Sequence, residues 1–168
     1  MEVVGFPEDI LEEIYKMACV ELCPPVTGQI LTELMVNPPA EGDESYKLYK
    51  EERDFVLSTL RMRAELLFQA FNKMEGVECQ KPQGAMYLFP KITVPPKACE
   101  EAAKLNTSPD SFYAMELLKN TGICVVPGSG FGQKPNTLHF RTTFLAPGGE
   151  DLSNRFIEFH KSFMQKYT

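Results

Sequence analysis

A periodic stretch over residues 44–74 constrains the fold of this chain more than any other feature of its sequence. Apolar residues such as Tyr49, Val56, Leu60 and Ala64 recur there at helical intervals, and Gly76 follows its end. A helix of about 30 residues would reach roughly 45 Å, which is longer than a small domain needs. The stretch therefore predicts a long helix that bridges two domains.

Two shorter helices are predicted before this stretch, on either side of a double-proline turn. Residues 7–20 place their apolar side chains on one helical face and carry acids in the first turn. The second helix is predicted to begin with Thr27 as its N-cap and to stop before the next pair of prolines. Between them Cys23, Pro24 and Pro25 interrupt the pattern, because proline removes a backbone donor.

Beyond the long helix the sequence changes to short strands separated by proline and glycine clusters. Strands are predicted at 77–80, 85–92, 123–126 and 138–145. Helices are predicted at about 97–105, from the N-cap Ser108 to Gly122 with Phe112, Met115 and Leu118 on one face, and at the end of the chain. A sheet covered by helices defines the class as α/β or α+β.

Composition excludes several classes of partner. Seventeen Lys and Arg against 23 Asp and Glu give a net charge of −6 with no basic cluster, so nucleic acid is not an expected partner. No apolar run approaches the roughly 20 residues that span a bilayer, so no membrane partner is expected either. Five cysteines without metal-binding or framework spacing indicate reduced thiols in a cytosol-like compartment, most of them as small core residues, and no metal site.

Arg141 stands in the middle of the predicted strand at 138–145. Alternation places it on the face opposite to Leu138 and Phe140. A guanidinium there must be exposed, paired with an acid or directed at a ligand, and its planar fork fits a carboxylate through two parallel hydrogen bonds. For an isolated strand arginine, an ion pair or plain exposure is the commoner outcome, and the neighbouring His139 is interpreted as structural.

Two glycine-containing segments allow a ligand or another backbone to come close. Residues 125–132 are rich in glycine but lack the Gly-Lys-Ser/Thr and the following helix of a phosphate loop, so a turn between strands is favoured. Gly84, Ala85, Met86 and Tyr87 begin the strand at 85–92 with small residues, for which an ordinary start of a strand is the plainer interpretation.

Taken together and in order, these segments closely resemble the eukaryotic alanine aminotransferases over essentially the whole chain. The resembling blocks are Met1-Glu2-Val3, Leu22-Cys23-Pro24-Pro25-Val26-Thr27-Gly28-Gln29, Asn37-Pro38-Pro39, Gln83-Gly84-Ala85-Met86-Tyr87-Leu88-Phe89-Pro90, Ser108-Pro109-Asp110, residues 121–133 and His139-Phe140-Arg141. Any one block could arise by chance, whereas the ordered set is specific.

The resemblance implies the C-terminal portion of a fold type I enzyme dependent on pyridoxal phosphate. It implies a remnant of the large-domain edge at 1–39, a bridging helix at 40–76 and a small substrate-closing domain at 77–168. In that family the arginine matched by Arg141 binds the substrate α-carboxylate, and Gly84, Ala85, Met86 and Tyr87 would line the substrate pocket. The turn at 127–132 would shape the strands beneath the site.

The resemblance also implies a homodimer. The loop that contains Cys23, Pro24, Pro25 and Thr27 is similar to one that reaches into the active site of the neighbouring subunit. The expected partners are thus a second copy of the enzyme and amino or keto acids bound through their carboxylates.

The cofactor-binding residues of the family have no match in this chain. The lysine that forms the Schiff base with pyridoxal phosphate lies upstream of the position matched by Met1, so no catalytic, cofactor-binding or metal-binding residue is assigned here. The complete enzyme is expected to transfer an amino group between alanine and 2-oxoglutarate. The isolated chain is expected neither to hold the cofactor nor to turn over.

Two alternatives stay open at this point. The chain could belong to another transaminase of the same branch, such as one that uses glutamate and glyoxylate, or it could be a non-catalytic dimerisation or regulatory product. The expected location is the cytoplasm, with the mitochondrion as the alternative.

Overall fold

The computed structural model describes residues 3–168; Met1 and Glu2, with which the first resembling block begins, lie outside the described residues. The chain divides into two compact units, Met1–Arg53 and Asp54–Thr168. The boundary between them falls within α3 (Tyr46–Lys73), whose 28 residues confirm the predicted long helix. The assignment of three domains at 1–39, 40–76 and 77–168 stays a prediction.

The first unit contains the two shorter predicted helices, α1 (Glu8–Ala18) and α2 (Val26–Val36). The N-cap of α2 is Pro25, which makes no side-chain capping hydrogen bond, so the prediction of Thr27 as N-cap is wrong. Gln29 Nε2 donates to the Pro24 carbonyl at 2.8 Å and thereby ties the double-proline turn to the helix. Neither helix has a buried residue, and both expose apolar side chains.

The second unit is built around the strand β5 (Leu138–Thr143). β2 (Tyr87–Leu88) and β3 (Lys91–Ile92) pair antiparallel with one edge of β5, and β4 (Val126–Pro127) pairs antiparallel with the other. β1 (Val77–Glu78) extends the sheet beyond β3. The pairs Tyr87–Thr143 and Lys91–His139 keep one register, so Phe89 lies opposite Arg141.

The strand predicted at 85–92 is wrong at its start and broken in its middle. Ala85 has a φ of 60°, in the left-handed region, so the chain turns there instead of extending. Pro90 has no N–H to donate, so the ladder is interrupted between β2 and β3, although Phe140 N–H still donates to the Pro90 carbonyl at 3.3 Å. The strand predicted at 123–126 is also misplaced, because pairing with β5 starts only at Val126.

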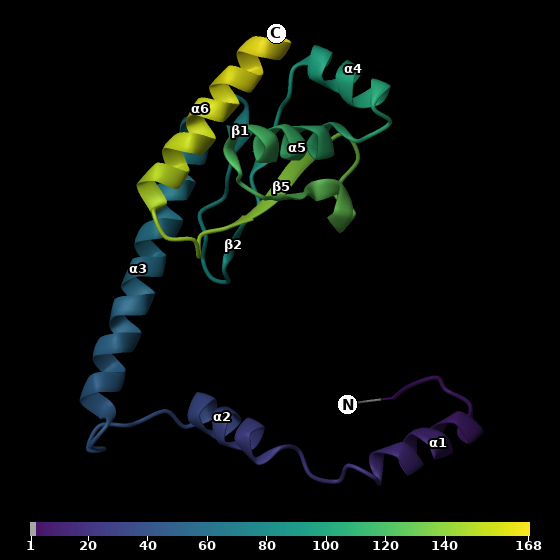
Figure 1. Ribbon diagram of the computed structural model, residues 1–168, viewed down its shortest axis with the longest axis vertical. Coiled ribbons are helices and arrows are strands. Elements are labelled where there is room, and N and C mark those ends of the chain that lie inside the picture. The colour runs from purple at the N-terminus through teal and green to yellow at the C-terminus, as the bar shows by residue number, and fades with distance from the viewer. Residues whose placement is uncertain (1–2) are drawn as a thin grey trace. The chain divides into compact units, whose positions relative to one another are not determined.

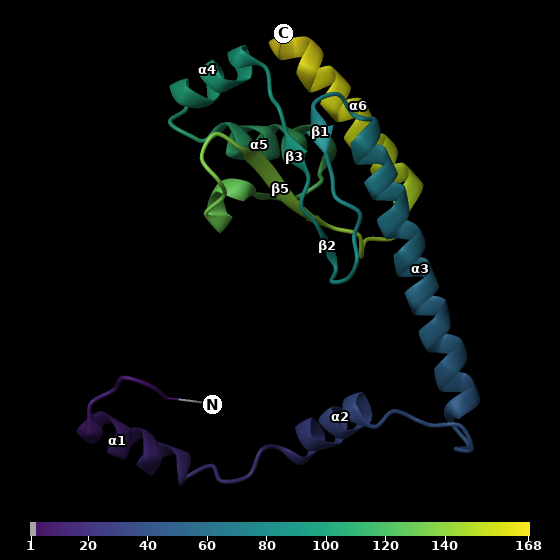
Figure 2. The same cartoon turned by 180° about the vertical axis from the view of Figure 1, so that it is seen from behind.

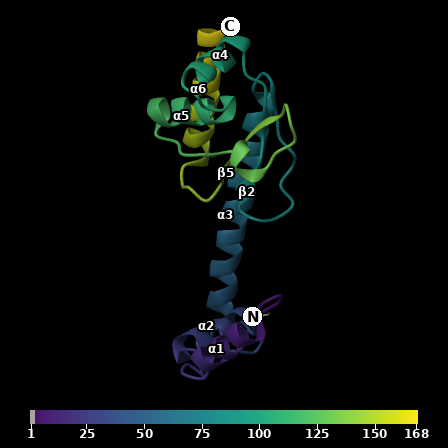
Figure 3. The same ribbon diagram turned by 90° about the vertical axis from the view of Figure 1, so that its right-hand side faces the viewer.

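One face of the sheet is covered by the C-terminal half of α3 together with α5 (Pro109–Thr121) and α6 (Gly149–Tyr167), which also packs along α3 (Figures 1 and 2). Phe140 is fully buried at the centre of this face. Its ring centroid lies 5.6 Å from that of Phe71 in α3, 5.8 Å from that of Tyr113 in α5 and 6.0 Å from that of Phe156 in α6. Figure 3 shows α5 and α6 together on one side of β5. The other face of the sheet therefore remains available for a site.

The ends of α5 are as predicted, but its buried face is not. Ser108 is the N-cap and Gly122, with a φ of 72°, ends the helix in the left-handed conformation. Met115 and Leu118 are exposed, whereas Tyr113 is fully buried against β5 and α6. Of the three residues on the predicted face only Phe112 is buried, so the helix packs with its face rotated toward Tyr113 and Leu117. α4 (Pro96–Lys104), predicted at 97–105, packs against α5 and α6.

Two expectations from composition can be compared with the structure. None of the cysteines is a buried core residue, because Cys19, Cys23 and Cys124 are exposed and Cys79 and Cys99 are half-buried. The expectation that most cysteines fill the core is therefore wrong. Among residues 3–168, no helix has the length and apolar character needed to cross a membrane.

Candidate functional site

Arg141 lies on the face of β5 that the helices leave uncovered. Along this strand Phe140 and Thr142 are buried, whereas His139, Arg141 and Thr143 are only partly buried, so the predicted alternation is confirmed. On one edge of β5 Arg141 pairs with Val126 of β4, and on the other edge the register brings Phe89 opposite to it. The guanidinium is thus anchored on the central strand of the sheet.

Two aromatic rings hold the Arg141 guanidinium. Its central carbon lies 4.6 Å from the centroid of the Tyr87 ring and 4.7 Å from that of the Phe131 ring. Each contact of this kind contributes about 0.5–1 kcal/mol at an exposed position. Ring contacts of this kind use none of the guanidinium N–H groups as hydrogen-bond donors to oxygen, so these groups can bind a planar acceptor, such as a carboxylate.

Arg141 forms none of the ion pairs found among residues 3–168. The ion pair that would be the commoner explanation of a strand arginine is therefore not observed. A permanent positive charge that is positioned by rings and lacks an acidic partner is suited to an anionic ligand.

A second aromatic pair extends this surface. Phe89 stacks on His139, with ring centroids 4.9 Å apart and planes only 5° from parallel, and its ring lies nearly perpendicular to that of Phe131, with centroids 5.7 Å apart. Burial, followed by the nearby Lys91 ammonium, lowers the pKa of His139, so its imidazole is neutral at pH 7. The stacked His139 ring therefore adds no positive charge beside Arg141.

A buried carboxylate fixes the glycine-rich turn that carries Phe131. Asp110, in the first turn of α5, is fully buried; its Oδ1 accepts from Ser111 N–H at 2.9 Å, and its Oδ2 accepts from Ser129 N–H at 2.7 Å and from Gln133 Nε2 at 2.9 Å. Burial alone would raise the pKa of this carboxyl, but hydrogen bonds from Ser108, Ser129, Gln133 and Ser111 hold it below its ordinary value. Asp110 is therefore ionised at neutral pH.

The glycine-rich segment is a turn between strands, as favoured from the sequence. It follows β4 and forms the single 3-10 turn Gly128–Phe131, after which Gly132 adopts a φ of 64°. A phosphate loop would direct its free backbone N–H groups at the ligand. Here Ser129 N–H already donates to Asp110, and a carboxylate at that place would repel a phosphate.

The four residues predicted to line a substrate pocket do not lie in one environment. Gly84 and Tyr87 both line a hollow of about 820 Å³ together with Phe89 and His139. Gly84 also lines a second hollow beside α3, which it shares with Ala85 but not with Tyr87, and the Met86 side chain is exposed. Tyr87 alone among the four has a ring contact with Arg141.

The predicted inter-subunit residues lie in the first unit. Cys23 and Pro24 are exposed between α1 and α2, Pro25 caps α2, and Thr27 is in the first turn of that helix. Their side chains are accessible.

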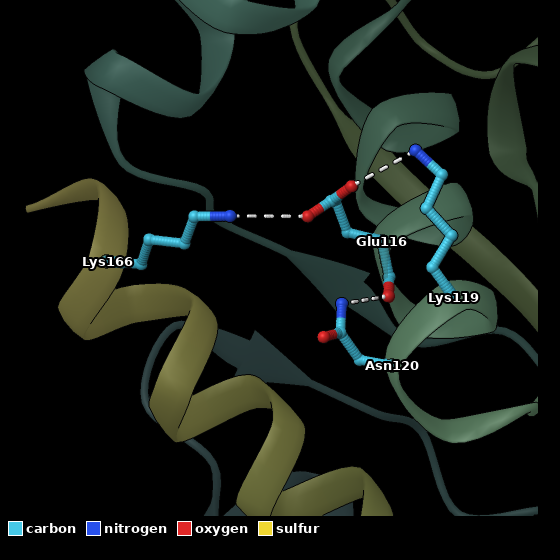
Figure 4. Close-up of polar contacts among 4 residues, drawn as sticks. All are labelled: Glu116, Lys119, Asn120 and Lys166. Carbon is cyan, nitrogen blue, oxygen red and sulfur yellow. Dashed lines mark hydrogen bonds and ion pairs between the residues drawn. The ribbon is translucent and has the colours of Figure 1, made fainter.

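A second polar cluster, centred on Glu116, has a structural role. Its carboxylate lies 3.4 Å from Lys119 in the same helix and 3.5 Å from Lys166 of α6, while Asn120 donates to its backbone carbonyl at 2.7 Å (Figure 4). Both lysines are more than half exposed, so these pairs add at most about 1 kcal/mol. The cluster ties α5 to α6.

Reasoning from the sequence missed three residues of the site. Phe131 was expected to shape the strands beneath the site, but it covers the guanidinium directly. Phe89 could have been found from the alternation of exposed Tyr87, Phe89 and Lys91 with buried Leu88 and Ile92. Asp110 carries no such signal, because an acid in the first turn of a helix is common wherever the helix lies.

A small antiparallel sheet that is covered by helices on one face and bears a positioned arginine on the other matches one class of enzyme, the aminotransferases. The family described as aminotransferase class I and II matches residues 14–159, so the chain belongs to that family. The chain is 54% identical over 167 residues to the mitochondrial alanine aminotransferase of Saccharomyces cerevisiae, covering 99% of this chain and 28% of that protein. It is 50% identical to an inactive alanine aminotransferase of the same yeast, covering 99% and 33%.

A solved structure supports the same assignment. The alanine aminotransferase from Pyrococcus furiosus superposes with a TM-score of 0.63 at 29% identity, covering 93% of this chain and 36% of that one. The predicted fold class and the resemblance to alanine aminotransferases are thereby confirmed. The chain spans roughly a third of the length of these relatives.

Proposed function

We propose that this chain supplies the substrate-carboxylate site of an aminotransferase that moves an amino group between alanine and 2-oxoglutarate. The observation that carries the proposal is the Arg141 guanidinium, held between Tyr87 and Phe131 without an acidic partner among the described residues. A bidentate carboxylate would lie in the plane of the guanidinium, which fixes the orientation of the rest of the substrate.

The chemistry of the described residues does not fit pyridoxal phosphate, the cofactor that the family implies. Lys81 and Lys91, the lysines that line the hollow beside Tyr87, are paired with Glu65 at 3.8 Å and Glu78 at 3.4 Å. The glycine-rich turn has its Ser129 N–H bound to Asp110, so it offers no cradle for a phosphate. We therefore infer that this chain alone neither retains the cofactor nor turns over.

A first experiment tests carboxylate binding. The Arg141 Nε–Hε signal is followed by NMR while acetate or pyruvate is added, with Arg141→Gln as the variant and Arg155→Gln, whose native guanidinium donates to the Thr121 carbonyl, as the control. Saturable shifts of this signal, together with pyruvate binding by calorimetry that is kept in Arg155→Gln and lost in Arg141→Gln, support the proposal. If the Arg141 shifts of the parent chain stay unchanged up to the highest pyruvate concentration tested, the proposal is contradicted.

A second experiment tests the inference about the cofactor. The purified chain is incubated with pyridoxal phosphate and dialysed, and the retained aldimine absorbance and the formation of pyruvate from alanine are measured. Neither is expected above the background of an unrelated protein of equal lysine content. Stoichiometric, saturable retention together with turnover would refute the inference.

A non-catalytic role is the second candidate function. One relative that is 50% identical is named an inactive alanine aminotransferase. In such a role Arg141 would bind a carboxylate ligand, but no amino group would be transferred. This role would be supported if pyruvate bound to Arg141 while every extended form of the protein that was tested failed to transaminate any amino donor.

We also propose a homodimer in which the loop around Cys23, Pro24, Pro25 and Thr27 meets the neighbouring subunit. The exposure of this loop and the tie from Gln29 to Pro24 support a preformed contact surface. Crosslinking through Cys23 tests this, with Cys19, which is also exposed, as the comparison: crosslinks through Cys23 and not through Cys19 support the proposal. The proposed location is the cytoplasm; because the yeast relative above is mitochondrial, cell fractionation is the deciding measurement.

A further inference from the structure

Asp110 is a buried charge whose hydrogen bonds reach well beyond its own helix. A first-turn carboxylate that only caps a helix binds the N–H groups of that helix. Asp110 Oδ1 does so with Ser111, but both hydrogen bonds to Oδ2 come from another segment, from Ser129 N–H and Gln133 Nε2. Helix capping therefore accounts for only part of this arrangement.

The two donors to Oδ2 bracket Phe131 in the sequence. Ser129 lies in the 3-10 turn with Phe131, and Gln133 follows immediately after Gly132. Fixing the chain on both sides of a residue fixes the backbone from which its side chain projects. The ring held in this way is the one 4.7 Å from the Arg141 guanidinium.

The same hydrogen-bond network also reaches the strand that carries Arg141. Gln133 Nε2 donates to Asp110, so its Oε1 is free to accept, and it lies 3.0 Å from His139 Nδ1. Nδ1 of His139 therefore carries the proton and donates. His139 is two residues from Arg141 on the same face of β5, and it stacks on Phe89, whose edge supports Phe131.

We infer that Asp110 is the positioning residue for the carboxylate-binding arginine, acting through Ser129, Gln133 and Phe131 to keep the Arg141 guanidinium clamped against Tyr87. This inference rests on the proposed function for its ligand, but the clamp itself exists without ligand. Asp110 touches no substrate. Backbone and amide donors bind its carboxylate, and none of the ion pairs among residues 3–168 joins it to Arg141, whose charge therefore stays available for a carboxylate ligand.

The test compares Asp110→Asn with Gln133→Leu. The first substitution leaves one acceptor oxygen in place of two, and the second breaks the relay without changing the cap of α5. The control is Asp151→Asn, which alters an acid in the first turn of α6 whose side chain is 76% exposed and pairs with Arg155.

The ligand-free measurement is the ring-current shift of the Arg141 side-chain protons, which lie between two aromatic rings. The Arg141→Gln spectrum assigns these signals. We expect Asp110→Asn and Gln133→Leu to move them toward random-coil values, and Asp151→Asn to leave them unchanged. This measurement stands even if pyruvate fails to bind, so failure of the clamp and failure of the proposed function are distinguishable.

The second measurement is the affinity of Arg141 for pyruvate, followed on the same signals. We expect a loss of about fivefold or more in both variants, because a mobile guanidinium must be ordered when it binds. If both variants keep the shifts and the affinity, Asp110 is only a helix cap and the inference is overturned. If Asp110→Asn does not fold, Gln133→Leu decides; if Asp110→Asn alone loses the shifts, the Ser129 route carries the effect and the inference stands.

Discussion

Replacing Gly128 with alanine tests whether the turn under Phe131 has room for a side chain. A Cβ at Gly128 would lie 2.3 Å from Gln133 Oε1, 2.8 Å from His139 Cβ and 2.9 Å from the His139 carbonyl oxygen. Gly130, two residues on in the same turn, has nothing within 4 Å of the equivalent position. Neither glycine has a positive φ, so the pair differs in space and not in backbone conformation.

The expected cost has two parts. Gln133 can swing away, but it then gives up its hydrogen bonds to Asp110 and His139, each contributing about 1 kcal/mol. The backbone of β5 cannot swing away, and forcing a methyl group against it costs about 1–3 kcal/mol. Alanine restricts the unfolded chain and returns only about 0.4–1 kcal/mol. The net loss expected for Gly128→Ala is therefore about 2–5 kcal/mol.

Urea denaturation of the two variants and the parent chain measures this difference. The chain has no tryptophan, so tyrosine fluorescence and near-UV circular dichroism follow the second unit, where Tyr113 is buried. Gly130→Ala should unfold within about 1 kcal/mol of the parent chain, or slightly above it. If Gly128→Ala has the same free energy of unfolding as Gly130→Ala, the close packing of this turn on β5 is refuted.

Three further outcomes are expected. Burial lowers the pKa of His160 from 6.5 and outweighs the opposite effect of the hydrogen bond from Nε2–H to the Glu75 carbonyl at 2.7 Å, so the fold favours neutral imidazole. The stability that this contributes is present above pH 6.5 and is lost as the pH falls below it. Urea titrations at pH 7.5 and 5.5 should show a smaller difference in His160→Gln than in the parent chain, and equal differences would contradict this. Burial raises the pKa of the Cys79 thiol to about 11, so at pH 8 iodoacetamide should modify it about 100-fold more slowly than a thiol with the ordinary value. Mass spectrometry that found Cys79 modified as fast as the exposed Cys124 would exclude that expectation. Leu31 on α2 is 63% exposed, so the chain should self-associate in light scattering and Leu31→Glu should reduce this; a strictly monomeric parent chain would contradict the expectation.

Local signals predicted the ends of α5 better than its packing. Ser108 and Gly122 mark α5 because an N-cap and a left-handed C-terminal glycine act within one turn of the helix. Which face of α5 is buried depends on the sheet beneath it, and Tyr113 packs there while Met115 is exposed. A helix with apolar residues on several sides does not encode that choice in its own sequence.

The site shows the same division between local and distant information. Alternation along β5 placed Arg141 on the uncovered face, since the period of a strand is a local property. That an aromatic ring from the turn at 128–131 covers the guanidinium depends on Asp110, which lies 21 residues before Phe131 in the sequence. No local pattern records such a contact, so Phe131 could be assigned only to the surroundings of the site.

The alternation of β5 links the stability of the second unit to its ability to bind an anion. Phe140 and Thr142 face the helices while His139 and Arg141 face the opposite way, so one strand serves the core and the site together. A shift of register by one residue would place the guanidinium among the rings of Phe71, Tyr113 and Phe156, where an unpaired charge is very costly. The charge that binds the ligand thus also specifies the register. For this reason Arg141→Gln should weaken carboxylate binding, cost the native state only the two ring contacts, about 1–2 kcal/mol together, and make the misregistered pairing less unfavourable.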